Sequence, residues 1–559
     1  MTTPFFSALF QQINNSRRSA AQSPRTENQT SDKRPQAAAA PARITQSADT
    51  EPHPIFDKRA DLKPQNAIDK AVFAKLESMN IRPANLCSDA VFLRRAYIDV
   101  IGTLPTASEA RQFLTDTDPD KRAQLIDRLL EREEYADYLA MKWCDLLRVK
   151  AEFPINLWPN AVQAYHRWIR TSIKENLPYD QFVRELLTAS GSNFRKPQVN
   201  FYRAIQGRDP KSIAGAVALS LMGARAENWP KERLDGMATF FSQIAYKSTG
   251  EWKEEILFFD ASIPLGGPDR PASDGPPKPS FPDGTVAEIP AGADPREVFA
   301  DWLITPGNPW FVKNVVNRLW CWLLGRGIIH EPDDIRDDNP PSNPELLAVL
   351  EKEFISNHAD TKGMLRLILN SNAYQLSSIP RSDHPDAAKY FASYPLRRLD
   401  AEVLIDALCQ ISGTSEEYTS AIPEPFTFIP DNQRSIELPD GSITSAFLEL
   451  FGRPPRDTGL DSERNNQPTP AQVLHLLNSS HIQKKIEQSP GIQRLLSQPA
   501  NAPGEAVALI YLTILSRFPQ REEYAVIQNY SQSGNPNRRE ATIDLIWALI
   551  NSTEFLYRH

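Results

Sequence analysis

The chain has 559 residues, of which 41% are hydrophobic and 24% charged, and it carries a formal net charge of −8. The negative balance argues against a general nucleic-acid-binding protein, which usually presents a basic face. The hydrophobic share is ordinary for a globular protein, and no window approaches the ~18 apolar residues that a membrane span needs. Its length predicts roughly two to four domains.

Residues 1–64 are rich in Ser, Gln, Ala and Pro and predict a disordered polar tail. The apolar run Phe5–Phe10 is shorter than the ~7–15 residue core of a secretory signal, and no basic segment precedes it. On the sequence alone, we therefore expect a cytoplasmic chain that is not exported by the usual route.

Residues 65–262 are expected to form a first helical domain. Apolar residues at i+4 spacing open it, and Ser88 or Asp89 is expected to cap a helix that stops near Gly102. Thr106 and Glu109 have the spacing of a capping box. The segment 251–260 is ambiguous between a short helix and a strand. Further helices are expected at 118–149, 158–176, 179–188, 212–222 and 234–244.

Residues 263–294 contain eight prolines and five glycines and have no hydrophobic period. This composition predicts a semi-extended linker and the main domain boundary. Residues 295–559 are then expected to form a second helical domain. Its later helices are expected at 397–411, 469–477, 506–515 and 541–555, with irregular structure at 421–444.

The stretch from Asn308 to Leu347 has the densest local signals in the second domain. Asn308 is expected to cap a largely buried helix with Pro309 in its first turn, and Gly325 is expected to end it. Asn343, again followed by proline, is expected to cap the next helix. The tryptophans interleave with Leu and Val, which favours core packing over sugar stacking; they are Trp310, Trp320 and Trp322. The fold class that follows is mainly α: two multi-helix domains joined by a Pro/Gly-rich linker, with minor short β pieces.

The four cysteines are far apart, and no CxxC or CxxCH motif occurs. The sequence therefore predicts no zinc ribbon, no thioredoxin-type site, no covalent haem, and more generally no metal and no cofactor. Buried, inert thiols are the expected state, and one or two disulfides remain an alternative.

The densest polar cluster is the acidic loop, residues 330–338, with the sequence HEPDDIRDD. Its candidate catalytic residues are His330, Asp333 and Asp334, because paired carboxylates can act as acid and base. Other interpretations are a cation site, a partner contact, or helix capping and salt bridges within the loop. The last is favoured, because the loop lacks an alternating Asp pattern around a central glycine and because Arg336 compensates its charge.

A second polar group follows later in the chain, in FGRPPR and a downstream Glu-Arg pair. Arginine forks suit carboxylate or phosphate recognition, but internal ion pairing with the acidic loop is the simpler interpretation. The candidate binding residues are Asn317, Arg318, Arg453, Arg456, Glu463 and Arg464.

Several of these segments together resemble the planctomycete-type cytochrome-associated proteins with the domain-of-unknown-function families 1549 and 1553. The segments that resemble the first family are FLRRAYIDVIGTLPTASEARQFL, LIDRLLEREEYADYLAMKWCDLLR, LPYDQFVREL and FFSQIAYKSTGEWKEEI. The segments that resemble the second family are the whole Asn308–Leu347 stretch, LILNSNAYQLSS, FGRPPR with the downstream Glu-Arg, and VLHLLNSSHI. The resemblance implies secreted or envelope proteins, often beside c-type cytochrome modules and carbohydrate or sulfatase loci, and hence a periplasmic or envelope location.

Two departures from the family pattern bear on function. Many relatives carry a CxxCH motif where Leu221–Phe241 has no cysteine, and many carry two cysteines where Gly459–Arg464 reads GLDSER. The favoured hypothesis is a non-catalytic binding or scaffold component with protein partners in envelope or polysaccharide-processing systems. The alternative is a carbohydrate-active, hydrolase-like enzyme that uses the acidic-loop carboxylates, with Arg318 or Arg453 orienting the substrate. An electron-transfer role is disfavoured because the haem motif is absent.

Overall fold

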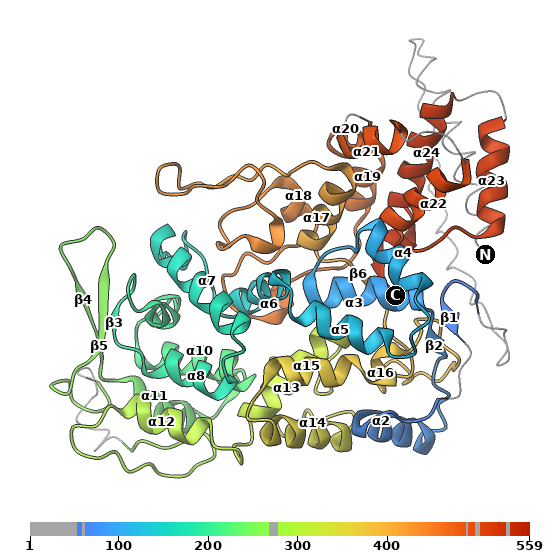
Figure 1. The fold of residues 1–559 in the computed structure, drawn as a ribbon. Helices are drawn as coiled ribbons and strands as arrows, with labels where there is room; N and C mark the ends of the chain where they lie inside the picture. Colours follow the sequence, from blue (N-terminus) through green and yellow to red (C-terminus); the bar gives the residue numbers. More distant parts are fainter. Residues whose placement is uncertain (1–52, 59–61, 268–277, 488–489, 498–502, 533–536) are drawn as a thin grey trace, which may run out of the picture.

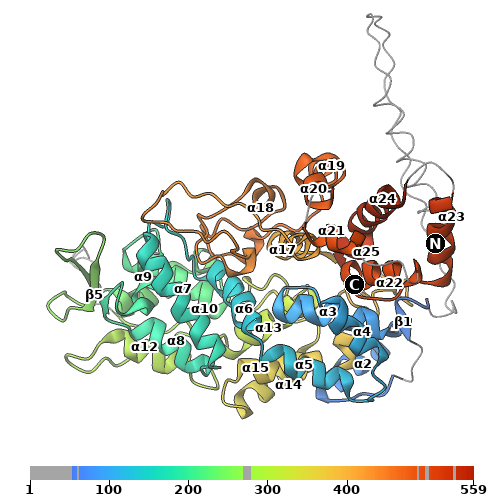
Figure 2. The ribbon, with the colours of Figure 1, turned by 45° about the horizontal axis from the view of Figure 1, so that its top comes forward.

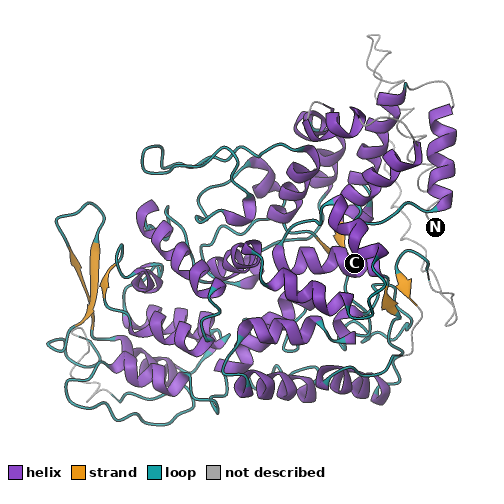
Figure 3. Ribbon diagram, viewed as in Figure 1, coloured by secondary structure: helices purple, strands orange, loops and turns teal. Residues whose placement is uncertain are grey.

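The computed structural model describes residues 53–58, 62–267, 278–487, 490–497, 503–532 and 537–559. Nearly all of its regular structure is helical, with a few short strands (Figure 3), so the predicted mainly α class is confirmed. Most of the predicted disordered tail lies outside the described residues. The part at 53–58 differs from that prediction, because Asp57–Lys58 (β1) pairs antiparallel with Leu86–Cys87 (β2).

Side-chain caps set the ends of the first helices as the sequence predicts. Ser88 accepts a hydrogen bond from the backbone N–H of Val91, and Gly102 ends the same helix in the left-handed conformation. Thr106 and Glu109 form the predicted capping box. The helices of this half are α2 (Ala67–Ser78), α3 (Asp89–Ile101), α4 (Ala107–Thr115), α5 (Lys121–Leu130), α6 (Glu133–Leu146), α7 (Pro159–Lys174), α8 (Tyr179–Thr188), η1 (Pro197–Val199), α9 (Asn200–Arg203), α10 (Pro210–Met222), η2 (Ala226–Asn228), α11 (Lys231–Ala238) and η3 (Thr239–Phe241).

The ambiguous segment near residue 255 is a strand. Ile244–Ser248 (β4) and Glu255–Phe259 (β5) form an antiparallel hairpin, and Gly191–Ser192 (β3) adds to the other edge of β5. Ile256, Phe258 and Phe259 favour the extended conformation here, and Leu257 between them is buried while its neighbours are half exposed. The hairpin projects from the body of the molecule (Figure 1).

The second half is also built from capped helices. Asn343 accepts a hydrogen bond from the first turn of its helix, as predicted, and Asp360 does the same for the helix that follows. The elements are α12 (Pro295–Leu303), α13 (Phe311–Leu324), α14 (Pro344–Ser356), α15 (Thr361–Leu369), α16 (Asn372–Gln375), β6 (Arg397–Arg398), α17 (Ala401–Ser412), η5 (Ser435–Glu437), α18 (Ala446–Leu450), η6 (Asp461–Glu463), α19 (Pro470–Asn478), α20 (Ser480–Glu487), α21 (Pro490–Ser497), α22 (Pro503–Ile514), α23 (Arg521–Gln532), α24 (Arg538–Ile550), α25 (Thr553–Leu556) and β7 (Tyr557–Arg558).

Helix α13 begins slightly later than predicted. Its regular turns start at Phe311, but the side chain of Asn308 accepts hydrogen bonds from the backbone N–H groups of Trp310 and Phe311, so it caps the helix as expected. Trp320 is fully buried, which confirms the core interpretation at that position. Trp322 is only half-buried, because its helix turn also borders a pocket.

The predicted linker is described at 263–267 and 278–294, and the second of these parts packs against helices. Phe281 is buried and stacks on Phe240 at 5.0 Å between ring centroids, and on Trp302 at 4.8 Å. Burying an aromatic ring of this size fixes the segment to η3 and α12.

Helices α3 and α6 lie between two parts of the second half. On one side, Phe92 and Trp143 belong to the hydrophobic cluster that includes α13, α14 and α15. On the other side, Ile98 and Met141 belong to the cluster that includes α17, α22 and α24. Helices α3 and α6 accordingly lie between the yellow helices and the orange-red ones in both ribbon views (Figures 1 and 2). The two halves of the chain therefore share their hydrophobic cores.

The described structure contains no disulfide bond and no helix that could span a membrane. All four cysteines are free thiols, and Cys87, Cys144 and Cys321 are buried. Among the described residues, none of the helices is both long and apolar enough to cross a membrane.

A buried histidine in α7 makes the fold sensitive to acid. Burial, together with the neighbouring arginines, Arg456 first, lowers the pKa of His166 to about 3. In the unfolded chain, the His166 side chain has a pKa near 6.5. The stability that neutral His166 contributes is therefore complete above that pH and is lost as the pH falls toward 3.

We expect the free energy of unfolding to drop by about 3 kcal/mol more between pH 7 and pH 4 in the wild type than in His166→Gln. Urea unfolding at the two pH values measures this, with the exposed His358→Asn as control. Equal pH dependence in wild type and His166→Gln would contradict it.

Candidate functional site at the junction of the two halves

A pocket of about 340 Å³ lies where α6 meets α13, β6, α17 and the loop 454–468. Its volume falls within the range of small-molecule sites, about 300–1,000 Å³. We call it the junction pocket, because α6 comes from the first half of the chain and the other walls come from the second. It is lined by Lys142, Asp145, Leu146, Cys321, Trp322, Gly325, Leu396, Arg397, Arg398, Asp400, Pro454, Leu460, Asp461, Arg464, Asn466, Gln467, Pro468 and Tyr557.

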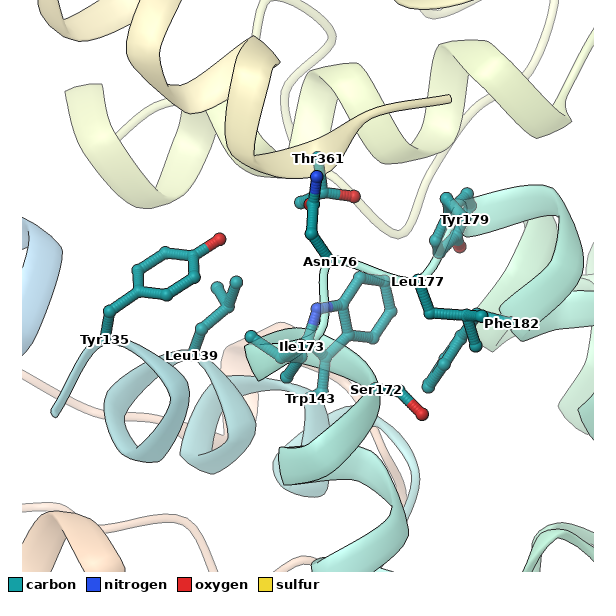
Figure 4. Close-up of a pocket in the computed structure, with 10 residues that line it drawn as sticks. All are labelled: Tyr135, Leu139, Trp143, Ser172, Ile173, Asn176, Leu177, Tyr179, Phe182 and Thr361. Atoms are coloured by element: carbon teal, nitrogen blue, oxygen red, sulfur yellow. The ribbon is translucent and has the colours of Figure 1, made fainter. Parts of the chain in front are cut away.

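Two further pockets border α6, but each has room for only about 20 Å³. Figure 4 shows one of them, where Tyr135, Leu139 and Trp143 of α6 face residues of α7, α8 and α15. A space of this size accommodates about one water molecule. These pockets are packing gaps, and the junction pocket is the larger candidate site.

The centre of the site is Asp400, at the start of α17. One carboxylate oxygen lies 2.8 Å from the Lys142 ammonium and 2.7 Å from the Arg558 guanidinium. The other accepts a hydrogen bond from the Asn466 amide at 2.6 Å. Burial alone would raise the pKa of Asp400, but Lys142 and Arg558 outweigh it and hold this pKa well below its usual range. Asp400 is therefore a fixed anion that joins α6 to the C-terminal strand β7.

Arg464 makes the second set of contacts. It donates to both carboxylate oxygens of Glu402, at 2.7 and 3.0 Å, and to Asp145 at 2.6 Å. The other oxygen of Asp145 accepts from the Nε of Arg456 at 2.9 Å. Arg453 lies 3.6 Å from Glu402 and donates to the backbone carbonyl of residue 440. The arginines do form internal ion pairs, but the predicted partner was wrong: they pair with carboxylates of α6 and α17, and not with the acidic loop.

The acidic loop pairs with α13 instead. Asp333 is buried, lies 2.7 Å from the Arg318 guanidinium, and accepts a hydrogen bond from the backbone N–H of Asp461 at 2.7 Å. Asp334 lies 3.2 Å from the exposed Arg336. His330 is exposed, and the nearest charged partner that it contacts is Glu331 at 3.5 Å. The three candidate catalytic residues thus have separate surroundings, and none of them lines the junction pocket.

The remaining candidate residues hold the backbone in place. Asn317 donates to the carbonyl of Ile329 and accepts from its N–H, each at 2.9 Å, which fixes the loop entering the acidic segment. Glu463 accepts hydrogen bonds from the backbone N–H groups of Asp457 and Thr458. Both side chains therefore make hydrogen bonds to nearby backbone groups.

Few polar groups in the pocket wall lack a partner within the protein; three of these are buried atoms, the Nε of Arg397 and of Arg398 and the Oδ1 of Asn466. The Gln467 amide and the Tyr557 hydroxyl have no hydrogen-bond partner among the described residues. The Asp461 carboxyl forms no ion pair with any described residue, and the indole of Trp322 donates a hydrogen bond to it. Burial raises the pKa of Asp461 above its usual range, with Arg318 opposing and Asp333 adding to the effect.

The sequence contained a signal for part of this site that motif reasoning passed over. Arg397, Arg398, Asp400 and Glu402 stand at the beginning of an apolar helix, and Asp145 interrupts the apolar run WCDLL. Charged residues in such surroundings are buried only when they are paired. The density of charge in an apolar context, rather than any known motif, marks the site.

Arg397 also closes the end of α13 and makes Gly325 necessary. It donates to the backbone carbonyls of Trp322 and Leu323 at 3.1 and 2.6 Å. Gly325 has φ +70°, and a Cβ there would lie 2.3 Å from the Cδ of Arg397.

Gly325→Ala is therefore expected to lower the free energy of unfolding by about 1–3 kcal/mol, measured by urea unfolding. The control is Gly215→Ala, inside α10 with nothing within 4 Å of the added Cβ, which is expected to be stabilising by about 0.5–1 kcal/mol. Equal effects of the two changes would contradict this account.

The described residues contain no group of three or more His, Cys, Asp or Glu side chains arranged to hold a metal ion.

In comparisons with known proteins, a family model described as "Protein of unknown function (DUF1549)", PSCyt2, matches residues 67–232. A second, described as "Protein of unknown function (DUF1553)", PSD1, matches residues 295–531. No curated protein and no solved structure gives a significant match. Helix α6 lies in the first matched segment, and the pocket walls from Cys321 to Pro468 lie in the second.

Proposed function

Because the chain belongs to the proteins that join a DUF1549 domain to a DUF1553 domain, we propose that it is a non-catalytic binding component whose ligand occupies the junction pocket. The observation that carries the proposal is a pocket of about 340 Å³ walled by both matched segments. We place this component with cell-envelope or polysaccharide-processing partners, as the resemblance of its sequence implies.

The state of the pocket carboxylates favours binding over catalysis. A catalytic base or nucleophile must be free to reach the reacting atom. Asp400 and Asp145 are instead held in ion pairs with Lys142 and Arg464. Asp461 is then the one carboxyl outside an ion pair among the described residues of the wall, and a glycosidase-type reaction needs two.

The test is a thermal-shift screen of a library of small polar metabolites. The variants are Gln467→Trp, which fills the pocket from an exposed wall position, and Gln112→Trp, a matched control on the exposed face of α4. We expect ligands that raise the Tm of the wild type and of Gln112→Trp but not of Gln467→Trp. Mass spectrometry is expected to recover these ligands chemically unchanged.

Two outcomes would count against the proposal. Ligands that bind Gln467→Trp as well as the wild type would place the site elsewhere. A ligand that binds in the pocket and is converted would show that the protein is an enzyme.

A further inference from the structure

We propose that the junction pocket selects a neutral, hydroxyl-rich ligand of the sugar or polyol class, and that Asp461 is the side chain that recognises its hydroxyl groups. This inference rests on the proposed function, because it takes the junction pocket as the ligand site. It adds the class of ligand and the residue that selects it.

Most of the charged groups in the pocket wall already form ion pairs or hydrogen bonds within the protein. Asp400 and Asp145 are paired with Lys142, Arg558, Arg456 and Arg464 at 2.6–2.9 Å. The terminal N–H groups of Arg397 and Arg398 donate to carbonyl and side-chain oxygens of the protein, and the Nε atom of each is buried without a hydrogen-bond partner. A charged ligand would lose its hydration and meet charged groups that already donate or accept hydrogen bonds within the protein, which is unfavourable. A neutral ligand avoids that cost.

Three polar side chains in the pocket wall are outside any ion pair among the described residues and are able to bind a ligand hydroxyl. A carboxyl group in its protonated form, an amide and a phenol hydroxyl each donate and accept hydrogen bonds. These are the side chains of Asp461, Gln467 and Tyr557, and all three line the pocket. A ligand hydroxyl likewise donates and accepts, so several hydroxyls on one small molecule match the wall. The ring of Trp322 adds an apolar surface for the carbon skeleton of such a ligand.

Asp461 is held in position by the rest of the site. Its backbone N–H donates to Asp333, which is itself paired with Arg318. The charged groups that act on its carboxyl are Arg318, Asp333 and Lys142, and the indole of Trp322 donates to it. Burial, the largest effect, raises the pKa of Asp461, which favours the protonated, donating form as the pH falls.

The experiment compares sugars that share one ring and differ in charge. Ligand-observed NMR titrations use methyl glucoside, glucuronate and glucosamine against the wild type. We expect the neutral sugar to bind about tenfold more tightly than either charged one, which corresponds to about 1.4 kcal/mol. Its affinity is expected to fall as the pH rises, because an ionised carboxylate cannot donate.

Variants of Asp461 separate recognition from folding. Asp461→Asn keeps a group that donates and accepts, so it is expected to retain neutral-sugar binding and to lose the pH dependence. Asp461→Ala is expected to lose about tenfold in affinity, the value of a hydrogen bond left unmade. Tyr557→Phe removes one hydroxyl from the wall and is expected to weaken binding by a smaller factor. Thermal unfolding verifies that each variant is folded.

The outcomes that overturn the inference are distinct from those that overturn the proposed function. Tightest binding of glucuronate or glucosamine would assign a charged ligand to the same pocket. If no sugar binds while library ligands still depend on position 467, the ligand class is wrong and the proposed function stands. If no ligand depends on that position, both are wrong.

Discussion

Replacing Arg464 with methionine is expected to lower the free energy of unfolding by about 3–5 kcal/mol, which is the usual cost of leaving a buried ion pair without one partner. The Arg464 side chain is 11% exposed and contacts both Glu402 and Asp145. Burial lowers the pKa of Arg464, but these two carboxylates outweigh it and raise the pKa above its ordinary value. Without the guanidinium, two carboxylates remain in a poorly solvated site. Urea unfolding of the full chain measures the loss.

An exposed arginine provides the matched control. Arg366 pairs with Asp127, but its side chain is 58% exposed, so Arg366→Met is expected to change stability by no more than about 1 kcal/mol. Adding Glu402→Gln to Arg464→Met removes one of the stranded charges and is expected to restore part of the stability. A loss in Arg464→Met no larger than in the control would show that the network contributes little to folding.

The helix ends were predictable because their signals are local. Ser88, Thr106, Asn343 and Asp360 cap the helices that follow them, and Gly325 ends α13. Each depends on hydrogen bonds or backbone conformation within about one helical turn. A single sequence contains all the information that such an interaction requires.

The pairing within the site was not predictable in the same way. Asp145 and Arg456 are 311 positions apart, and Tyr138 and Asp400 are 262 apart. Nothing local distinguishes these partners from the acidic loop, which offers more carboxylates and is closer in sequence to the arginines than Asp145 is. The packing of α6 between two hydrophobic clusters decides the matter, because it brings Asp145 and Lys142 to α17.

The same packing changes the meaning of the acidic loop. Asp333 links the Arg318 guanidinium on α13 to the backbone of Asp461, and so it supports the pocket wall from behind. Asp334 contacts the half-exposed side chain of Arg336 at the surface. Two adjacent aspartates therefore have different roles, which no motif distinguishes.

Asn substitutions at these two positions separate the roles. Asp333→Asn leaves the buried Arg318 guanidinium without an anion and is expected to lower the free energy of unfolding by about 3–5 kcal/mol. Asp334→Asn removes an ion pair with a half-exposed arginine and is expected to stay within about 0.5 kcal/mol of the wild type. Urea unfolding of both variants, with the pocket ligand present and absent, measures stability and binding together. Because Asp333 holds Asp461, its replacement is also expected to weaken ligand binding, whereas Asp334→Asn is not. The reverse result, a stable Asp333→Asn variant and a functionally impaired Asp334→Asn variant, would return the acidic loop to the role of a surface active site.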